Sequence, residues 1–165
     1  MSLKDAFIAE QKHESGLTQK ILERVPLDKK EWKPHEKSMT LGRLATHVAE
    51  IPHWISDIIH IPHYDFMKHY TGAHTASSSE ELMKIFREKL DKANQDLAQA
   101  SDETFNRQWV VGQGEKIIYQ LPVKVAIRGW GMSHLYHHRG QLSVYLRLLD
   151  VPVPGMYGPS ADESM

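Results

Sequence analysis

Two histidines with the spacing of metal ligands, His134 and His138, lie in the stretch Gly129–Leu142. The apolar residues around them recur at helical period, and residues four apart project from one helix face about one turn apart. Two imidazoles in that arrangement can reach the same metal ion. The rest of the chain must then supply a third ligand and a scaffold.

A third histidine, His47, has the same kind of surroundings in an earlier helix. Its apolar stripe comprises Leu44, His47, Val48, Ile51, Trp54, Ile55 and Ile58. The stripe of the last helix comprises Val123, Ile127, Trp130, Gly131, His134, His138, Gln141, Leu142, Tyr145, Leu148 and Leu149. A histidine in an apolar place must satisfy two ring nitrogens, and a shared metal ion satisfies one nitrogen of each. We therefore predict a site of His47, His134 and His138; the alternative is three core histidines with protein partners.

Three neutral imidazoles suit a borderline divalent ion, and Zn²⁺ or Ni²⁺ is expected. Three protein ligands leave a coordination position open, which is typical of catalytic sites. Such an ion lowers the pKa of a bound water or thiol, or polarises a carbonyl group. His137 projects about 60° away from this face and is not expected to be a ligand. The candidates for orienting the ligand rings are Glu10, His13, Gln141 and Tyr145.

Other chemical motifs are absent or incomplete, so no catalytic side chain is predicted. The sequence has no His-Glu-x-x-His, no Gly-x-Ser-x-Gly and no Gly-rich phosphate loop. The run Glu50–His53 matches the Glu-x-x-His of di-iron bundles, but it occurs once and contains Pro52. Four histidines in a predicted loop lack paired spacing and are expected to be solvated: His60, His63, His69 and His74.

The periodicity predicts an all-α fold, a four-helix bundle with a short loop or strand insertion before the last helix. We expect helices over 3–25, 40–59, 78–100 and 122–149, a short hairpin or two extended pieces over 109–119, and a non-helical tail over 150–165. Thr40 is expected to cap the second helix, Ser78 and Glu81 to form a capping box for the third, and Pro52 to bend the second helix or open one hydrogen bond. Trp32, in the loop 26–39, is expected to cover the core or a pocket. The 165 residues are predicted to form one domain, 1–165.

Composition narrows the class of protein. The net charge is −1 without a basic stripe, which disfavours nucleic acid. The lack of cysteine excludes disulfides, thiolate zinc sites and thiol nucleophiles. No apolar run reaches the length of a membrane span and no signal peptide is recognised, so a cytoplasmic protein is expected. A second apolar strip on the last helix has two interpretations, packing under the loops or a homodimer interface: Val125, Met132, Leu135, Tyr136 and Leu146.

These residues resemble the DinB-like (damage-inducible, YfiT-type) superfamily of small four-helix bundles with a three-histidine metal site. The resemblance rests on Leu44-Ala45-Thr46-His47, on His134-x-x-x-His138-Arg-Gly-Gln-Leu, and on the tail Pro152-x-Pro154 with Tyr157–Glu163. It places the family's metal ligands on His47, His134 and His138, in agreement with the argument from helix faces. It also implies a homodimer.

The resemblance leaves the reaction open. Some relatives are transferases or isomerases that use low-molecular-weight thiols, and the damage-inducible name implies no DNA binding. Our first hypothesis is a divalent-metal-dependent enzyme, a thiol-dependent S-transferase or a related hydrolase or isomerase acting on an electrophilic small molecule. The alternative is a non-catalytic stress-response protein that binds a metal or small ligand.

Overall fold

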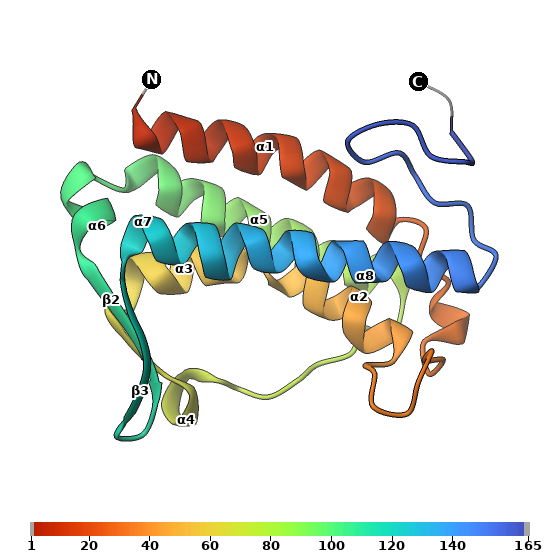
Figure 1. Cartoon of the computed structure of the whole chain (residues 1–165), viewed down its shortest axis with the longest axis horizontal. Helices are drawn as coiled ribbons and strands as arrows, with labels where there is room; N and C mark the ends of the chain where they lie inside the picture. The colour runs from red at the N-terminus through yellow and green to blue at the C-terminus, as the bar shows by residue number, and fades with distance from the viewer. Residues whose placement is uncertain (1, 164–165) are drawn as a thin grey trace.

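The computed structural model describes residues 2–163 and is mostly helical, with one small sheet (Figure 1). Four helical stretches pack side by side: α1 (Leu3–Leu22), α2 with α3 (Leu41–Glu50 and His53–His60), α5 (Ser79–Gln99), and the continuous run of α7, η2 and α8 (Val123–Ala126, Ile127–Ser133 and His134–Leu148). A 3₁₀ turn, η1 (Leu27–Lys29), and a short helix, α6 (Asp102–Asn106), lie in the connections.

None of the helices within the described residues is both long enough and apolar enough to cross a lipid bilayer.

Local side chains start the helices, largely as predicted. The Thr40 hydroxyl accepts a hydrogen bond from the Arg43 backbone N–H and caps α2. Ser78 caps α5 through the Glu81 N–H, but the Glu81 carboxylate accepts from the Ser77 N–H, so the capping box is incomplete. A complete capping box at α1, formed by Ser2 and Asp5, was not predicted from the sequence.

Pro52 divides the second predicted helix into α2 and α3. Proline has no N–H to donate, and α2 ends at Glu50 while α3 begins at His53. The Ile51 N–H still donates to the His47 carbonyl oxygen at 3.1 Å, so only two residues, Ile51 and Pro52, separate the two helices. His47 therefore lies one turn before a helix end.

The all-α prediction is wrong in one respect, because the structure contains a three-stranded sheet. The hairpin is confirmed as β2 (Gln108–Gln113) and β3 (Lys116–Pro122), which are antiparallel. The loop predicted over 60–79 also contains β1 (His63–Asp65), parallel to β2, and α4 (Phe66–His69). A three-residue strand has too little pattern to be recognised, and its partner is distant in sequence. Gly112 marks a register shift in β2, where a Cβ atom would come 2.6 Å from the Lys116 carbonyl oxygen.

The last helix contains a π-helical segment, η2, that sequence periodicity did not anticipate. The His134 N–H reaches back to the Gly129 carbonyl oxygen, five residues earlier. An extra residue in a turn rotates the following helix face by about 100° relative to a continuous α-helix. The centre of the buried face of α8 therefore consists of Leu135, Arg139, Leu142 and Leu146, and the two histidines flank it, half-buried.

This rotation corrects the prediction for the second apolar strip. Met132, Leu135 and Leu146 are buried in the chain's own core, and only Val125 is well exposed. The packing interpretation of the strip is therefore the right one. Gly131 allows η2 to approach α3 closely, since a Cβ atom there would lie 3.0 Å from Ile55. Trp32 packs edge-on against Tyr145 with ring centroids 5.5 Å apart, so it covers the core.

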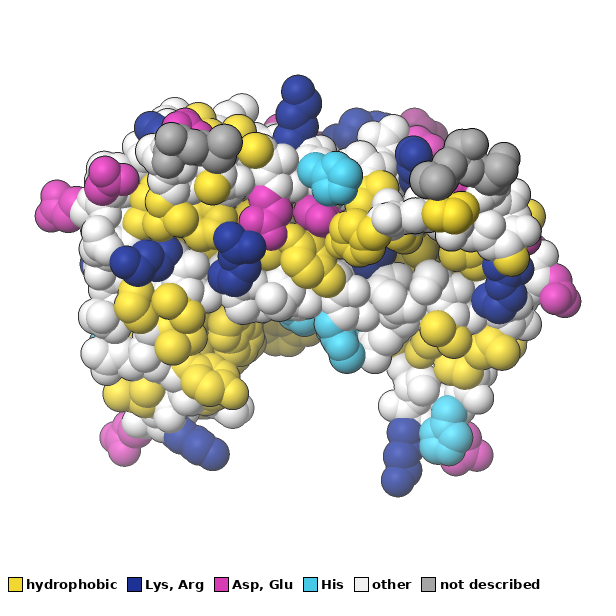
Figure 2. All heavy atoms as spheres, turned by 45° about the horizontal axis from the view of Figure 1, so that its top comes forward, with side chains coloured by type: hydrophobic (Ala, Val, Ile, Leu, Met, Phe, Trp, Pro, Cys, Tyr) yellow, Lys and Arg dark blue, Asp and Glu magenta, His cyan; other side chains and the backbone are white. Residues whose placement is uncertain are grey.

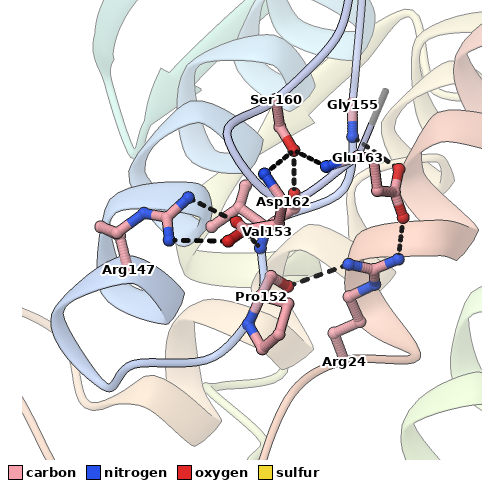
Figure 3. Close-up of polar contacts among 8 residues, drawn as sticks. All are labelled: Arg24, Arg147, Pro152, Val153, Gly155, Ser160, Asp162 and Glu163. Carbon is pink, nitrogen blue, oxygen red and sulfur yellow. Dashed lines mark hydrogen bonds and ion pairs between the residues drawn. The ribbon is translucent and has the colours of Figure 1, made fainter. Parts of the chain in front are cut away.

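The described part of the tail, 150–163, is non-helical, as predicted, and is held by reciprocal polar contacts (Figure 3). Arg24 at the end of α1 donates to the Pro152 carbonyl oxygen and pairs with Glu163. Arg147 at the end of α8 pairs with Asp162, and the Asp162 carboxylate also accepts from the Val153 N–H. Exposed ion pairs contribute little singly, about 0–1 kcal/mol each. Their number fixes the path of the tail across the ends of α1 and α8.

A buried ion pair connects α1 to α8 beneath the tail. Arg139 is 3% exposed and donates to the Glu14 carboxylate at 2.5 Å, to the Glu14 carbonyl oxygen and to the Thr18 hydroxyl. The Tyr157 hydroxyl from the tail donates to the same carboxylate at 2.8 Å. The arginine of the His-Arg-Gly-Gln run is thus a structural group whose buried charge is fully paired.

Removing one partner of this pair should destabilise the fold strongly. Arg139→Met leaves the Glu14 charge buried and unpaired, and we expect it to cost about 3–5 kcal/mol in the free energy of unfolding. The double variant Arg139→Met/Glu14→Met removes both charges and should recover most of that loss. Urea unfolding of the metal-free proteins measures both values. A double variant as unstable as the sum of the two single variants would contradict the pairing.

Candidate metal centre

Three histidines from two helices converge on one point. His47 comes from α2, and His134 and His138 come from successive turns of α8. One ring nitrogen from each lies within 4.8 Å of the other two, and Nε2 of His47 is 3.2 Å from Nε2 of His134. Within residues 2–163 no other group of three histidine or acidic side chains comes together in this way. The structure brings the three predicted residues together.

The outer ring nitrogens have unequal partners. His138 Nδ1 lies 2.8 Å from the Gln141 side-chain oxygen. Because that oxygen can only accept, Nδ1 carries the proton and Nε2 keeps its lone pair free for a metal ion. His47 Nδ1 faces the Arg43 guanidinium at 3.3 Å, and a guanidinium can only donate. In this arrangement His47 therefore carries its proton on Nε2 and donates it to His134. His134 Nδ1 is buried and makes no well-formed hydrogen bond within residues 2–163, and the acceptor that acts on this ring is the Trp130 carbonyl oxygen, four residues earlier.

The environment keeps all three imidazoles neutral near pH 7. Burial is the main cause that lowers the pKa of His47 to about 3, with further contributions from His138, His134 and Arg43. Burial also lowers the pKa of His134 to about 4, and the Trp130 carbonyl acts in the opposite direction. The pKa of His138 is lowered by burial as well, against the effect of Gln141. Neutral imidazole is the form that binds a metal ion.

This donor set fits a divalent ion. Two nitrogens at about 2.0–2.1 Å from a tetrahedral ion stand roughly 3.3 Å apart, close to the 3.2 Å between His47 and His134. A metal ion would displace the proton shared by these two rings. His47 would then carry its proton on Nδ1, the nitrogen that faces Arg43, and Arg43 is paired with Glu50 at 2.8 Å.

The candidates for the outer shell are only partly confirmed. Gln141 contacts His138, as predicted. Glu10 instead accepts from Tyr136 and Arg128, His13 faces Tyr157, and the Tyr145 hydroxyl donates to the Met39 carbonyl oxygen. None of these three bonds a histidine of the triad. Tyr145 follows His138 by seven residues in α8 and shares its face, but it lies about two turns further along the helix, where its hydroxyl bonds Met39 instead.

Arg43 is a neighbour of the triad that was not predicted from the sequence. It precedes His47 by four residues, so the same spacing that paired His134 with His138 would have placed it beside His47. The di-iron alternative fails on geometry, since Glu50 pairs with Arg43 and His53 pairs with Asp57. His137 is exposed, with its ring 4.8 Å from that of His138, and lies outside the converging group.

Two cavities open on different sides of the triad. One, of about 530 Å³, lies between β3 and η2 and is lined by His134; the other, of about 330 Å³, is lined by His47 and by residues of α2, α3 and the segment 69–72. Figure 2 shows a hollow between two projections of the molecule, with histidine and hydrophobic side chains along its upper edge. His134 and His47 thus each border space that small molecules can enter.

The chain thus combines a mostly helical fold with three histidines that converge on one point. The model of the DinB family matches residues 1–165, and the chain belongs to this family. It is 27% identical over 164 residues to the uncharacterized protein YrdA of Bacillus subtilis strain 168, covering 96% of this chain and 90% of that protein.

Two solved structures share the fold. A DinB-like protein of Bacillus cereus ATCC 10987 matches with a TM-score of 0.71 and 21% identity, over 93% of this chain and 97% of that one. The DinB-like protein YjoA of Bacillus subtilis matches with a TM-score of 0.68 and 19% identity, over 87% of this chain and 91% of that one. The predicted family is therefore confirmed.

Acid should destabilise the metal-free protein through the triad. A histidine in the unfolded chain titrates near pH 6.5, but the folded pKa values of His47 and His134 are about 3 and 4. Below pH 6.5 the unfolded chain binds more protons, so stability that is fully present above this pH is lost as the pH falls. Urea unfolding at pH 7 and pH 5 should show a larger loss for the wild type than for His47→Gln/His134→Gln. Equal losses would contradict the lowered pKa values.

Proposed function

We propose that this protein is a divalent-metal-dependent enzyme of the cytoplasm that acts on small molecules, with thiol-dependent S-transfer as the favoured reaction. The observation that carries the proposal is the convergence of three neutral imidazoles at the border of two cavities. His47, His134 and His138 would hold the ion, for which Zn²⁺ or Ni²⁺ is the best match to the donor set. When bound, such an ion supplies Lewis-acid chemistry and favours the ionised form of a thiol or water.

The protein's own residues would orient the ligands and the polar reactant. Gln141 fixes the tautomer of His138, and the Arg43–Glu50 pair holds the outer side of His47. The cavity on the His47 side contains both signs of charge, including Arg43, Glu50 and Lys89. Mixed charge of this kind suits a low-molecular-weight thiol that carries carboxylate and amino groups. The related hydrolase and isomerase activities would use the same groups.

We propose that the scaffold is the four-helix bundle expected from the sequence, and the packing of its helices supports this. α1 packs on α5 and α8, and α2 packs on α5 and α8. We also propose a homodimer, on the family resemblance alone, formed through a surface other than the buried strip on the last helix.

Loss of one triad histidine should abolish metal binding. His47→Ala, His134→Ala and His138→Ala should each reduce bound Zn²⁺ or Ni²⁺ to well below one equivalent, because two imidazoles form a weak site. His137→Ala is the matched control on the same helix and should bind a full equivalent. Elemental analysis after dialysis and isothermal titration measure both. Unchanged metal content in His47→Ala would refute the triad.

Activity separates the enzyme from the non-catalytic alternative. The metal-loaded wild type should transfer low-molecular-weight thiols to members of an electrophile panel, and the His47→Ala protein should not. A protein that is stabilised by metal in a thermal-shift assay, gains nothing from thiols and turns over none of the electrophiles would favour a binding protein instead.

The contact between Gln141 and His138 provides a finer test of the centre. Gln141→Leu removes the acceptor that fixes the proton of His138 on Nδ1, and metal affinity should fall by roughly 10–100-fold. Gln141→Glu keeps an acceptor and should retain affinity. Competition with a chromogenic chelator gives the dissociation constants. Equal affinity in the wild type and Gln141→Leu would mean that His138 is oriented by its packing alone.

A further inference from the structure

The cavity of about 530 Å³ beside His134 has an apolar wall. β3 contributes Tyr119 and Leu121, and the α7–η2 segment contributes Val125, Gly129 and Trp130. Its volume lies within the range of about 300–1,000 Å³ that small-molecule sites occupy. His134 is the one triad histidine in the lining, so a molecule seated there would border the metal centre.

The charge of the lining differs sharply from that of the second cavity. Among the described residues, no aspartate, glutamate, lysine or arginine lines the cavity beside His134, and its polar members are the uncharged Ser133 and the histidines at its edge, His134 and His137. The cavity on the His47 side includes Arg43, Glu50, Asp57 and Lys89. A charged group entering the apolar cavity would lose hydration without gaining an ionic partner. The lining therefore selects a neutral, apolar group.

The walls of this cavity are held in place before any ligand arrives. The Trp130 ring lies 5.2 Å from Trp54, 5.8 Å from Trp109 and 6.1 Å from Tyr119, measured between ring centroids. Contacts on several sides restrict its rotamers, and aromatic edges and faces suit a further ring. A preformed apolar wall lowers the entropic cost of binding.

Gly129 keeps the cavity open. A glycine within a helix costs roughly 0.5–1 kcal/mol relative to alanine. A Cβ atom at Gly129 would meet no atom within 4 Å, so neither close packing nor an unusual backbone angle requires glycine there. Because Gly129 lines the cavity, a larger side chain at this position would occupy it.

We infer that this cavity binds the neutral aryl or alkyl part of the electrophilic substrate, whose reacting atom then lies at the histidine centre. The inference rests on the proposed function for the reacting atom, but the apolar binding itself does not. The two reactants would approach the centre from different sides, the apolar electrophile past Trp130 and the polar thiol past Arg43.

The first experiment tests the cavity without metal. The neutral dye N-phenyl-1-naphthylamine is titrated into the wild type, Gly129→Leu, Val125→Gln and Gly16→Leu, with emission as the readout. Gly129→Leu should weaken binding by roughly tenfold, since its side chain takes the place of the dye, and Val125→Gln should weaken it less. Gly16 in α1 also has open space at its Cβ position, so Gly16→Leu is the matched control and should bind as the wild type does.

The second experiment tests whether the cavity opens onto the metal centre. Imidazole and 4-phenylimidazole are titrated into Co²⁺-loaded protein, with the visible absorption of the ion as the readout. The phenyl group should tighten binding by roughly tenfold in the wild type, and Gly129→Leu should lose that gain.

The outcomes separate the two proposals. Normal dye binding in a protein that holds no Co²⁺ would refute the metal centre and leave the apolar site in place. Absence of dye binding, equal binding by wild type and Gly129→Leu, or no gain from the phenyl group would overturn the inference. Dye binding that falls as a dimer forms in sedimentation experiments would also overturn it, because the cavity would then be an interface between copies.

Discussion

The π-helical segment Ile127–Ser133 is the constraint on which the site depends. It rotates α8 so that Arg139, rather than a histidine, faces the core against Glu14. His134 and His138 are thereby moved to the edge of the buried face, where His47 meets them. The same segment carries Gly129 and Trp130 to the wall of the apolar cavity. Metal ligands buried in the centre of the core could not have bordered a cavity, and such π-helical insertions often occur at functional sites.

Much of the fold and the ligand set could be predicted from the sequence because they depend on local periodicity. The caps at Thr40 and Ser78, the break at Pro52 and the hairpin all follow from residue chemistry within a few positions. His47 was correctly paired with the two later histidines because each helix has a recognisable apolar stripe. The caps, the break and the hairpin needed no knowledge of how distant segments meet, and the pairing of His47 needed only that two apolar stripes face one core.

The failures have two physical causes, a strand that depends on a distant partner and a helix that is not a continuous α-helix. β1 forms because β2 lies beside it, not because three residues favour a strand. The face assigned to Leu135 and Leu146, together with Val125, assumed 3.6 residues per turn through a segment that has more. Gly129 and Gly131 are two residues apart, yet only Gly131 is in close contact with another helix. An inserted residue in a helix leaves no signature in composition.

The three histidines lie on helices, whereas part of each cavity wall lies on a connecting segment. The histidines belong to α2 and α8, whose positions are fixed by the core, whereas β3 and the segment 69–72 help to line the two cavities. Substitutions in those connecting segments would change which molecules enter while leaving the ligands in register. The same three histidines would then be retained in descendants whose cavities differ, and the cavities would diverge faster than the helices.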